Sequence, residues 1–446
     1  MYSINENYLK LQGSYLFADI AKKVAAYEKE HPDQKLIRLG IGDVTKPLVP
    51  SVIAALHKAV DEQARQETFR GYPPEGGFGF LKQAIISGDF EPLGISLSEE
   101  EILISDGAKS DVGNIREIFG ADTTVAVCDP VYPVYVDSNV MAGVSSGFDA
   151  KSGRFKDILY LPCTRENRFV PELPVESSKE KAPGLIYICS PNNPTGCAMT
   201  KDDLQSFVDY ANRVGSVIIF DAAYEAYITE ENIPHSIYEC TGAKTCAIEH
   251  RSFSKNAGFT GLRLSYTIVP KELTCKASSG KTVQLRDLWA RRQTTKYNGA
   301  PYIVQRAAEA IYSPEGKKEV RENVAGYLRN ASLILNGLKD MGFEAYGGVN
   351  SPYIWLRTPN NMTSWEFFDL LLQKAGIVGT PGVGFGSCGE NYFRLTAFGT
   401  EENSREALER IAKLSIKNNV GRLYRPLSNK AFVYCNQNGL YRFDRA

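Results

Sequence analysis

The sequence predicts an α/β protein: a large domain with a mostly parallel sheet sandwiched by helices, beside a smaller α+β domain. Two observations carry this prediction. Short apolar runs recur along the chain, separated by amphipathic helical segments such as 200–215, which is typical of parallel strands buried on both faces. After residue 300, a long helical stretch leads into a smaller mixed pattern with two more apolar runs, YIWLR (353–357) and YFRLTAF (392–398).

Each element follows from its local pattern. Residues 14–31 have the periodicity of an amphipathic helix, residues 50–120 combine helical patterns with glycine-rich turns, and 301–341 reads as a long helical stretch. The expected strands of the large sheet are 123–129, 185–190, 216–224, 244–254 and 262–270. The predicted division is an N-terminal arm with part of the small domain (1–50), the large domain (51–300), an interdomain helix with the C-terminal small domain (301–419), and an extension without clear periodicity (420–446).

Composition excludes several classes of protein. A formal net charge of −1 over 446 residues gives no electrostatic footprint for nucleic acid or for an anionic membrane. Nine dispersed Cys without a CxxC pair, and only four His, indicate reduced thiols and no metal site. No apolar run is long enough to span a bilayer, and the N-terminus lacks the features of a signal peptide. We therefore expect a cytoplasmic protein, or a plastid stroma protein whose leader has been removed.

Polar residues follow the expected strands at their carboxyl ends, which is where open α/β sheets bind ligands. The residues placed there are Asn193 in SPNNPTG, Asp221 and Tyr224 in and after SVIIFD, and Ser252, Ser254 and Lys255 in RSFSK. In addition, SDGAKSD (105–111) is a glycine turn into a helix, whose first amides can bind an anion. The sequence thus predicts a site along one edge of the sheet.

Taken singly, these features have ordinary structural explanations. A strand-end Asp is usually a helix cap, NNPTG alone is a turn, and a lysine after a serine normally faces solvent. The ordered set is more specific: an anion-binding turn, an aromatic in DPVYP, an Asn turn, Asp-x-x-Tyr, SxSK, and an Arg eight residues later. Together they fit a ligand with a phosphate, a pyridine nitrogen, a phenolic oxygen and an aldehyde, which is pyridoxal 5′-phosphate.

On these motifs, over roughly residues 5–415, the chain resembles the class I/II aminotransferases of pyridoxal-phosphate fold type I, the aspartate-aminotransferase-like fold. Further stretches are similar to the LL-diaminopimelate aminotransferases, among them NENYLKLQGSYLF, RSFSKNAGFTG, RRQTTKYNG and YFRLTAFG. The resemblance implies a transaminase of lysine biosynthesis that converts LL-2,6-diaminopimelate and 2-oxoglutarate into tetrahydrodipicolinate, L-glutamate and water. It also implies ping-pong kinetics and a homodimer with shared active sites, while neither nucleic acid nor a membrane is expected as a partner.

The resemblance implies roles for the residues around the cofactor. Lys255 forms the internal aldimine and then shuttles the proton, Asp221 keeps the pyridine nitrogen protonated, and Tyr132 stacks on the ring. Asn193 and Tyr224 hydrogen-bond the phenolic oxygen. The remaining cofactor contacts are Ala108, Lys109, Ser252, Ser254, Arg263, Asn298 and, reaching a neighbouring subunit's phosphate, Tyr72. Pro73 stands where the family usually has Gly, and it restricts Tyr72 to an extended backbone.

For the substrate, the resemblance assigns the α-carboxylate to Arg394, whose planar fork suits bidentate binding, with help from Asn298. The other implied substrate contacts are Tyr15, Gly42, Lys109, Tyr132 and Asn193. Three alternatives stay open: a class I/II aminotransferase for aspartate, aromatic or alanine-type substrates, a β-lyase, and a catalytically silent protein that binds the cofactor. A dinucleotide-binding dehydrogenase is excluded because no G-x-G-x-x-G turn follows an early strand.

Overall fold

The computed structural model describes residues 2–12, 16–40, 42–175 and 182–414, and the paired strands β18 (Val433–Asn436) and β19 (Gly439–Arg442). The predicted extension over 420–446 lies outside the described residues except for those two strands. In this part of the chain, no helix combines the length and the apolar character needed to cross a bilayer.

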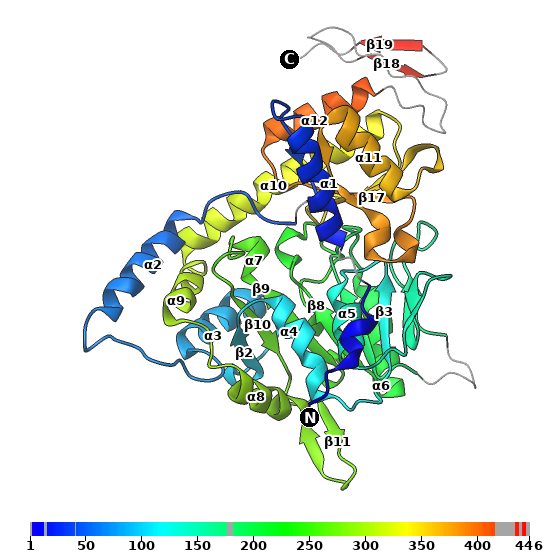
Figure 1. The fold of residues 1–446 in the computed structure, drawn as a ribbon. Coiled ribbons are helices and arrows are strands. Elements are labelled where there is room, and N and C mark those ends of the chain that lie inside the picture. The colour runs from blue at the N-terminus through cyan, green and yellow to red at the C-terminus, as the bar shows by residue number, and fades with distance from the viewer. Residues whose placement is uncertain are drawn as a thin grey trace.

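The centre of the molecule is a seven-stranded sheet with the order β2-β10-β9-β8-β7-β3-β6 (Figure 1). Its strands are β2 (Ile102–Ser105), β3 (Val125–Asp129), β6 (Ile158–Pro162), β7 (Leu185–Cys189), β8 (Val217–Asp221), β9 (Ala247–Ser252) and β10 (Ser265–Ile268). Strand β10 is antiparallel to both neighbours, and the other pairs are parallel. The prediction of a mostly parallel sheet is confirmed.

Five of these strands coincide with the predicted apolar runs, but β2 and β6 are not among the predicted elements. Strand β2 has only four residues, all buried, in a region where helical patterns dominate. Strand β6 lies at the edge of the sheet, and exposed side chains interrupt its buried positions. Strand β2 is too short, and β6 too mixed in polarity, to show a clear hydrophobic period.

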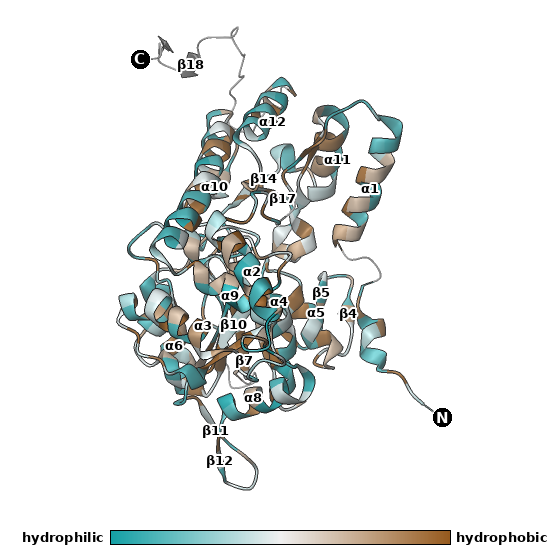
Figure 2. Ribbon diagram, turned by 90° about the vertical axis from the view of Figure 1, so that its left-hand side faces the viewer, coloured by the Kyte–Doolittle hydropathy of each residue, from teal (hydrophilic) through white to brown (hydrophobic). Residues whose placement is uncertain are grey.

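Helices cover both faces of this sheet, and alternate residues of each strand pack against one or the other layer of helices. Ile186 and Ile188 of β7 share a core with helices α3, α6 and α9, whereas Leu185 and Tyr187 pack with α4, α5 and α8. Figure 2 shows the apolar colour gathered in the inner strands such as β7 and β10. The helices of this part are α2 (Pro50–Gln63), α3 (Gly79–Ile85), α4 (Ala108–Asn114), α5 (Val134–Met141), α6 (Lys201–Val214), α7 (Phe253–Asn256), α8 (Leu285–Lys296) and α9 (Tyr302–Ala310).

Helix α6 shows how the local sequence sets the limits of an element. The Thr200 hydroxyl accepts a hydrogen bond from the Asp203 amide (3.2 Å), and the Asp203 carboxylate accepts one from the Thr200 amide (2.9 Å). A cap of this kind contributes about 1 kcal/mol. Leu204 and Phe207, one turn apart, bury the apolar face against the sheet, and Gly215 ends the helix in a left-handed conformation.

The predicted helical stretch over 301–341 consists of two helices. Helix α10 (Pro314–Asp340) begins after Ser313, whose hydroxyl accepts a hydrogen bond from the Gly316 amide (3.0 Å). Proline is tolerated at the first helical position because no amide is needed there, so Pro314 starts a new helix. Helix α10 then connects the cores: Tyr327 packs in the large part and Ile334 in the small part.

A second, antiparallel sheet has the order β13-β14-β17-β16 and forms the smaller part. Val24 and Tyr27 of α1 share its core with Phe367 and Phe393, so segments from both ends of the chain pack together (Figure 1). Its elements are α1 (Leu16–Glu30), β1 (Ile37–Arg38), β13 (Ala345–Gly347), β14 (Tyr353–Arg357), α11 (Ser364–Ala375), β15 (Ile377–Val378), β16 (Thr380–Pro381), β17 (Tyr392–Thr396) and α12 (Glu401–Lys413). Besides β18–β19, two hairpins lie outside these sheets, β4–β5 (Phe148–Asp149 with Arg154–Phe155) and β11–β12 (Thr274–Lys276 with Thr282–Gln284).

Candidate active site

A cavity of about 360 Å³ lies at the carboxyl ends of β7, β8 and β9, and we call it the strand-edge pocket. It forms there because these strands end in register: Cys189 is opposite Asp221, and Asp221 is opposite His250. The residues that follow each strand therefore emerge side by side. The predicted site residues that line this pocket are Gly42, Ala108, Lys109, Tyr132, Asn193, Asp221, Tyr224, Ser252, Ser254, Lys255, Arg263 and Arg394.

Lys255 extends into the strand-edge pocket from the short helix α7, and its Nζ donates a hydrogen bond to the Gly42 carbonyl. The backbone before it is fixed, since the Ser252 hydroxyl accepts a hydrogen bond from the Ser254 amide (3.1 Å), and the Tyr227 hydroxyl donates to the Lys255 carbonyl (2.8 Å). Burial lowers the pKa of Lys255 to about 8. A substantial share of the amine is thus neutral near pH 7 to 8, as a nucleophile requires.

Asp221 ends β8 and is buried, and this burial raises the pKa of its carboxyl group. Its carboxylate accepts hydrogen bonds from the Tyr135 hydroxyl (2.7 Å) and from the Ala223 amide (3.0 Å). Tyr135 is not among the predicted site residues. The signal for it is in DPVYPVY: Tyr132 precedes helix α5, Tyr135 lies three residues later in its first turn, and the two rings meet edge to face with centroids 6.2 Å apart.

The two asparagines of SPNNPTG have different tasks. Asn192 holds the turn together: its amide donates to the Cys197 carbonyl (2.8 Å) and its side chain to the Thr195 hydroxyl (3.1 Å). Asn193 faces the pocket, where its side-chain oxygen accepts a hydrogen bond from Arg394 (2.6 Å). The turn therefore presents the Asn193 side chain to the pocket, while Asn192 holds the turn in shape. The peptide bonds that precede Pro191 and Pro194 are both cis.

Arg394 is a buried cation on β17, and burial lowers its pKa. One terminal nitrogen donates to the Gly40 carbonyl (2.7 Å), and the guanidinium carbon lies 4.7 Å from the centre of the Tyr353 ring and 4.8 Å from that of Phe385. Among the described residues, no carboxylate pairs with it and its Nε has no hydrogen-bond partner. A buried charge left unpaired is costly, which indicates a place for an anion.

The start of helix α4 forms a second anion cradle. Gly107 precedes the helix with φ of +130°, and a Cβ at this position would lie 2.0 Å from a terminal nitrogen of Arg263. Only glycine lets this guanidinium lie so close to the start of the helix, whose first amides have no acceptor within it. Asp111 anchors the helix by accepting hydrogen bonds from Ser105 (2.5 Å) and Ser265 (2.9 Å). With Ser252 and Ser254 beside it, the cradle suits a phosphate.

Tyr132 lines the pocket on a loop that is tied to the small part of the molecule. The buried Asp129 accepts hydrogen bonds from Arg154 (2.7 Å) and from Ser387 (2.8 Å), and the Val131 amide donates to the Phe385 carbonyl (2.8 Å). The Lys109 amine lies 5.8 Å from the centre of the Tyr132 ring.

Two predicted site residues do not line the pocket, and a third, Tyr15, lies outside the described residues. Tyr72 is 86% exposed, and Asn298 is exposed too. Their segments lie side by side on the surface, because the Thr294 hydroxyl donates a hydrogen bond to Glu75 (2.6 Å). Neither side chain contributes to the pocket of its own chain.

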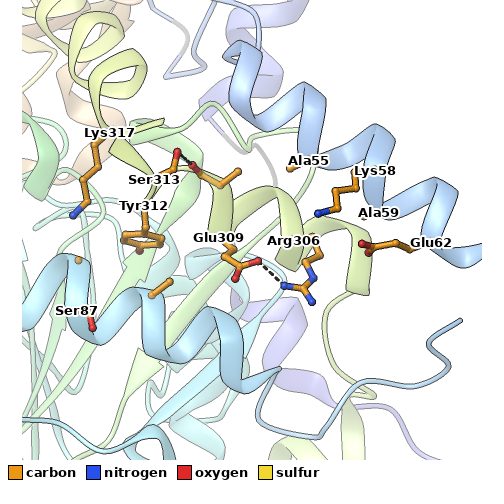
Figure 3. A pocket seen from close by; sticks show the side chains of 13 residues that line it. Ala55, Lys58, Ala59, Glu62, Ser87, Arg306, Glu309, Tyr312, Ser313 and Lys317 are labelled. Carbon is orange, nitrogen blue, oxygen red and sulfur yellow. Dashed lines mark hydrogen bonds and ion pairs between the residues drawn. The ribbon is translucent and has the colours of Figure 1, made fainter. Parts of the chain in front are cut away.

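A second cavity of about 580 Å³ lies between α2, the segment after α3, α9 and the start of α10, and we call it the helix pocket (Figure 3). Three of its charged side chains have partners: Arg306 pairs with Glu309 (2.7 Å), and Glu62 accepts a hydrogen bond from the neighbouring Tyr302 (2.6 Å). Figure 3 shows Lys58 and Lys317 on different sides of it. Within the described ranges, no group of three or more His, Cys, Asp or Glu is placed to hold a metal ion.

The strand-edge pocket thus combines a nucleophilic amine, a buried acid, an anion cradle at a helix start and an unpaired arginine. This set can hold a ligand that carries a carbonyl, a basic ring nitrogen and a phosphate, next to the carboxylate of a second molecule.

Comparisons with known proteins agree with this chemistry. The family model "Aminotransferase class I and II" matches residues 34–411. LL-diaminopimelate aminotransferase of Lachnospira eligens is 60% identical over 414 residues, which are 93% of this chain and 100% of that protein. The enzyme of the same name from Bacteroides fragilis is 56% identical over 408 residues, 92% of this chain and 98% of that protein.

Solved structures give the same result. The L,L-diaminopimelate aminotransferase of Chlamydomonas reinhardtii superposes with a TM-score of 0.85 at 42% identity, covering 93% of this chain and 98% of that chain. A Thermus thermophilus aspartate aminotransferase mutant matches with a TM-score of 0.78 at 21% identity, over 93% of this chain and 100% of that one. The second likeness shows the fold alone, which is the predicted aspartate-aminotransferase-like fold.

Proposed function

The chain belongs to the class I and II aminotransferase family, and within it we propose that the protein has LL-diaminopimelate aminotransferase activity. The substrates would be LL-2,6-diaminopimelate and 2-oxoglutarate, and the products tetrahydrodipicolinate, L-glutamate and water. The observation that carries the substrate assignment is that relatives 55–60% identical over nearly the whole chain all bear this name. The protein is therefore a transaminase of lysine biosynthesis.

The strand-edge pocket fits pyridoxal 5′-phosphate, which in aminotransferases supplies an electron sink for the carbanion at the substrate Cα. Lys255 would bind the aldehyde carbon, and its amine, released by the substrate's own amine, would carry the proton from and to Cα. Asp221 would keep the ring nitrogen protonated, because a nearby carboxylate stabilises the positive charge of the protonated nitrogen. Hydrogen bonds from Tyr135 and Ala223 hold this carboxylate in place. The buried amine and buried acid line one pocket, which supports this assignment.

The other cofactor contacts follow from the groups in the pocket. Asn193 and Tyr224 would hydrogen-bond the phenolic oxygen, and Tyr132 would lie against the ring. The phosphate would occupy the cradle of Arg263, Ser252, Ser254 and the first amides of α4, at Ala108 and Lys109.

Arg394 would bind the α-carboxylate of each amino acid in turn, which explains why a buried guanidinium has no carboxylate partner among the described residues. Because amino donor and acceptor share this group, they would use the pocket one after the other, and we expect ping-pong kinetics. Gly42, Lys109 and Tyr15 would contact the far end of diaminopimelate, which carries a second amino acid centre.

Tyr72 and Asn298 would complete the site of a second subunit in a homodimer. Both are exposed and lie in neighbouring segments, away from the pocket of their own chain. A mixture of Tyr72→Phe and Lys255→Ala chains tests this, since a hybrid dimer has one site with both residues intact. Random reassociation is expected to give about a quarter of wild-type turnover, more than either variant alone. Turnover equal to the sum of the separate variants would contradict the shared site.

The assignment of the substrate is tested by a 2-oxoglutarate-dependent assay with LL-diaminopimelate and meso-diaminopimelate side by side. Aspartate, alanine and phenylalanine at equal concentration serve as the comparison panel. We expect the highest kcat/KM with LL-diaminopimelate. Efficient turnover of a panel amino acid, with none of LL-diaminopimelate, would assign the chain to another aminotransferase activity. Elimination products without glutamate would indicate a β-lyase.

A further inference from the structure

Tyr353 is a pocket residue to which neither the motifs nor the assignments above give a task. It begins strand β14, and its hydroxyl lies 2.5 Å from the hydroxyl of Tyr224. Both phenols are buried, with 1% of Tyr353 and 6% of Tyr224 exposed. Two buried hydroxyls at this distance share one hydrogen bond, so one of the two protons is left to be directed elsewhere.

The backbone of Tyr353 is held firmly in place. A Cβ at Gly196, in the SPNNPTG turn, would lie 2.3 Å from the Tyr353 carbonyl oxygen, and a Cβ at Gly347 would lie 2.5 Å from it. Both glycines have positive φ, +68° and +71°, so other residues are disfavoured on two grounds. The turn that carries Asn193 is therefore locked against the strand that carries Tyr353.

The surroundings of the Tyr353 side chain favour its role as the donor. Its ring lies 4.7 Å from the guanidinium carbon of Arg394, and its hydroxyl would lie 2.9 Å from a Cβ at Gly42. The Arg394 cation beside the ring favours loss of the Tyr353 proton and so makes Tyr353 the more acidic of the two phenols, whose pKa values are both raised by burial. The more acidic phenol is the better donor.

We propose that Tyr353 is a positioning residue that acts through Tyr224. It donates its hydroxyl proton to the Tyr224 oxygen, and this leaves the Tyr224 proton to point into the strand-edge pocket. There it would meet the phenolic oxygen of the cofactor and stabilise it as an anion. The inference rests on the proposed function, because it needs pyridoxal phosphate in this pocket.

The test uses the holoenzyme and three variants, Tyr353→Phe, Tyr224→Phe and the double variant. The readout is the pH at the midpoint of the change in the bound cofactor's absorption, with kcat and KM for glutamate measured alongside. Tyr353→Phe is expected to raise the midpoint by about 0.5–1 pH unit, because the anionic oxygen loses part of its donor. Its kcat should fall about 3- to 10-fold with little change in KM.

The double variant decides whether the effect passes through Tyr224. Its midpoint is expected to equal that of Tyr224→Phe alone, since Tyr353 then has nothing to direct. Tyr238→Phe is the matched control: this buried phenol donates to the Ala247 and Ile268 carbonyls on the other face of the sheet, and its loss should leave the midpoint unchanged. An unshifted Tyr353→Phe midpoint, or a full extra shift in the double variant, would overturn the proposal.

A chain with 3-fluorotyrosine at position 353 covers the case in which Tyr353→Phe loses the cofactor. A more acidic phenol donates more strongly, so the midpoint should move down rather than up. No movement, or an upward shift, would count against the proposal. If the wild-type protein itself showed no cofactor band and no transamination, the proposed function would fail instead, which keeps the two failures distinct.

Discussion

The strand-edge pocket and the helix pocket differ in what their polar groups do for one another. In the helix pocket, which is the larger, Arg306 pairs with Glu309, and both side chains are about one-third exposed. In the strand-edge pocket, Lys255, Asp221 and Arg394 have pKa values shifted by burial. Size alone therefore does not identify a site. A site is identified instead by buried charged groups whose partner must be a bound ligand.

The cause of this difference is the backbone around each pocket. Side chains on the exposed faces of packed helices have water and neighbours within reach, so their charges are easily satisfied. Side chains that follow parallel strands are held at one buried edge, where the register of β7, β8 and β9 brings them together. We expect substitutions in the two pockets to differ sharply, and paired variants test this.

The largest effect is expected for Lys255→Ala against Lys317→Ala in the helix pocket. Loss of the nucleophile and proton carrier should reduce transamination by at least about 10⁴-fold. Borohydride reduction followed by peptide mass mapping should find the cofactor on Lys255 in the wild type and on no residue of the variant. A reduced adduct on another lysine would remove Lys255 from its proposed role, and inactivity of Lys317→Ala would abolish the contrast between the pockets.

The next effect is expected for Arg394→Lys, which keeps the charge and loses the fork. The substitution should lower kcat/KM about 10²-fold for diaminopimelate and glutamate alike, or about 3 kcal/mol, because both present the same α-carboxylate. Steady-state kinetics on each half-reaction measure it. Arg306→Lys is the matched control, since the Glu309 ion pair tolerates an ammonium group. A loss confined to one of the two substrates would argue against a shared carboxylate site.

A pH dependence follows from the lowered pKa of Lys255. The protonated amine does not react, so capture of pyridoxal phosphate by the cofactor-free protein should slow about tenfold for each pH unit below 8 and level off above it. Stopped-flow absorbance gives this profile. Were the amine exposed, with its ordinary pKa near 10.5, the rate would still be rising at pH 9. That outcome would place Lys255 among ordinary surface lysines.

A smaller effect is expected for Tyr135→Phe, which removes one of the two hydrogen bonds to the Asp221 carboxylate. The loss of one such bond costs about 1 kcal/mol, so kcat should fall about fivefold with cofactor still bound. Tyr302→Phe, which removes the hydrogen bond to Glu62 beside the helix pocket, is the control and should keep full activity. Equal kinetics of the two variants would show that Tyr135 does not support Asp221.

Local patterns in the sequence predict much of the strand-edge pocket. Asp221 ends strand β8, and Lys255 comes three residues after the end of β9, so their position follows from strand order alone. Tyr353 and Tyr224 are 129 residues apart, and no local pattern reports that their hydroxyls meet. The same limit applies to Arg263, whose place across Gly107 depends on how β10 pairs with β2. Long-range packing, rather than propensity, decides these contacts.

The smallest effect is expected for the double variant Lys58→Ala and Lys317→Ala in the helix pocket. Lys58 is exposed on α2 and Lys317 half-buried near the start of α10, on different sides of the cavity (Figure 3). Removing two such amines leaves the Arg306–Glu309 pair in place, so stability should change by less than about 1 kcal/mol and kcat/KM by less than about twofold. Thermal unfolding of the holoenzyme and the LL-diaminopimelate assay measure both. A loss of activity with unchanged stability would mean that the helix pocket takes part in function. Partly exposed, paired charges would then not distinguish a cavity without function from a functional one.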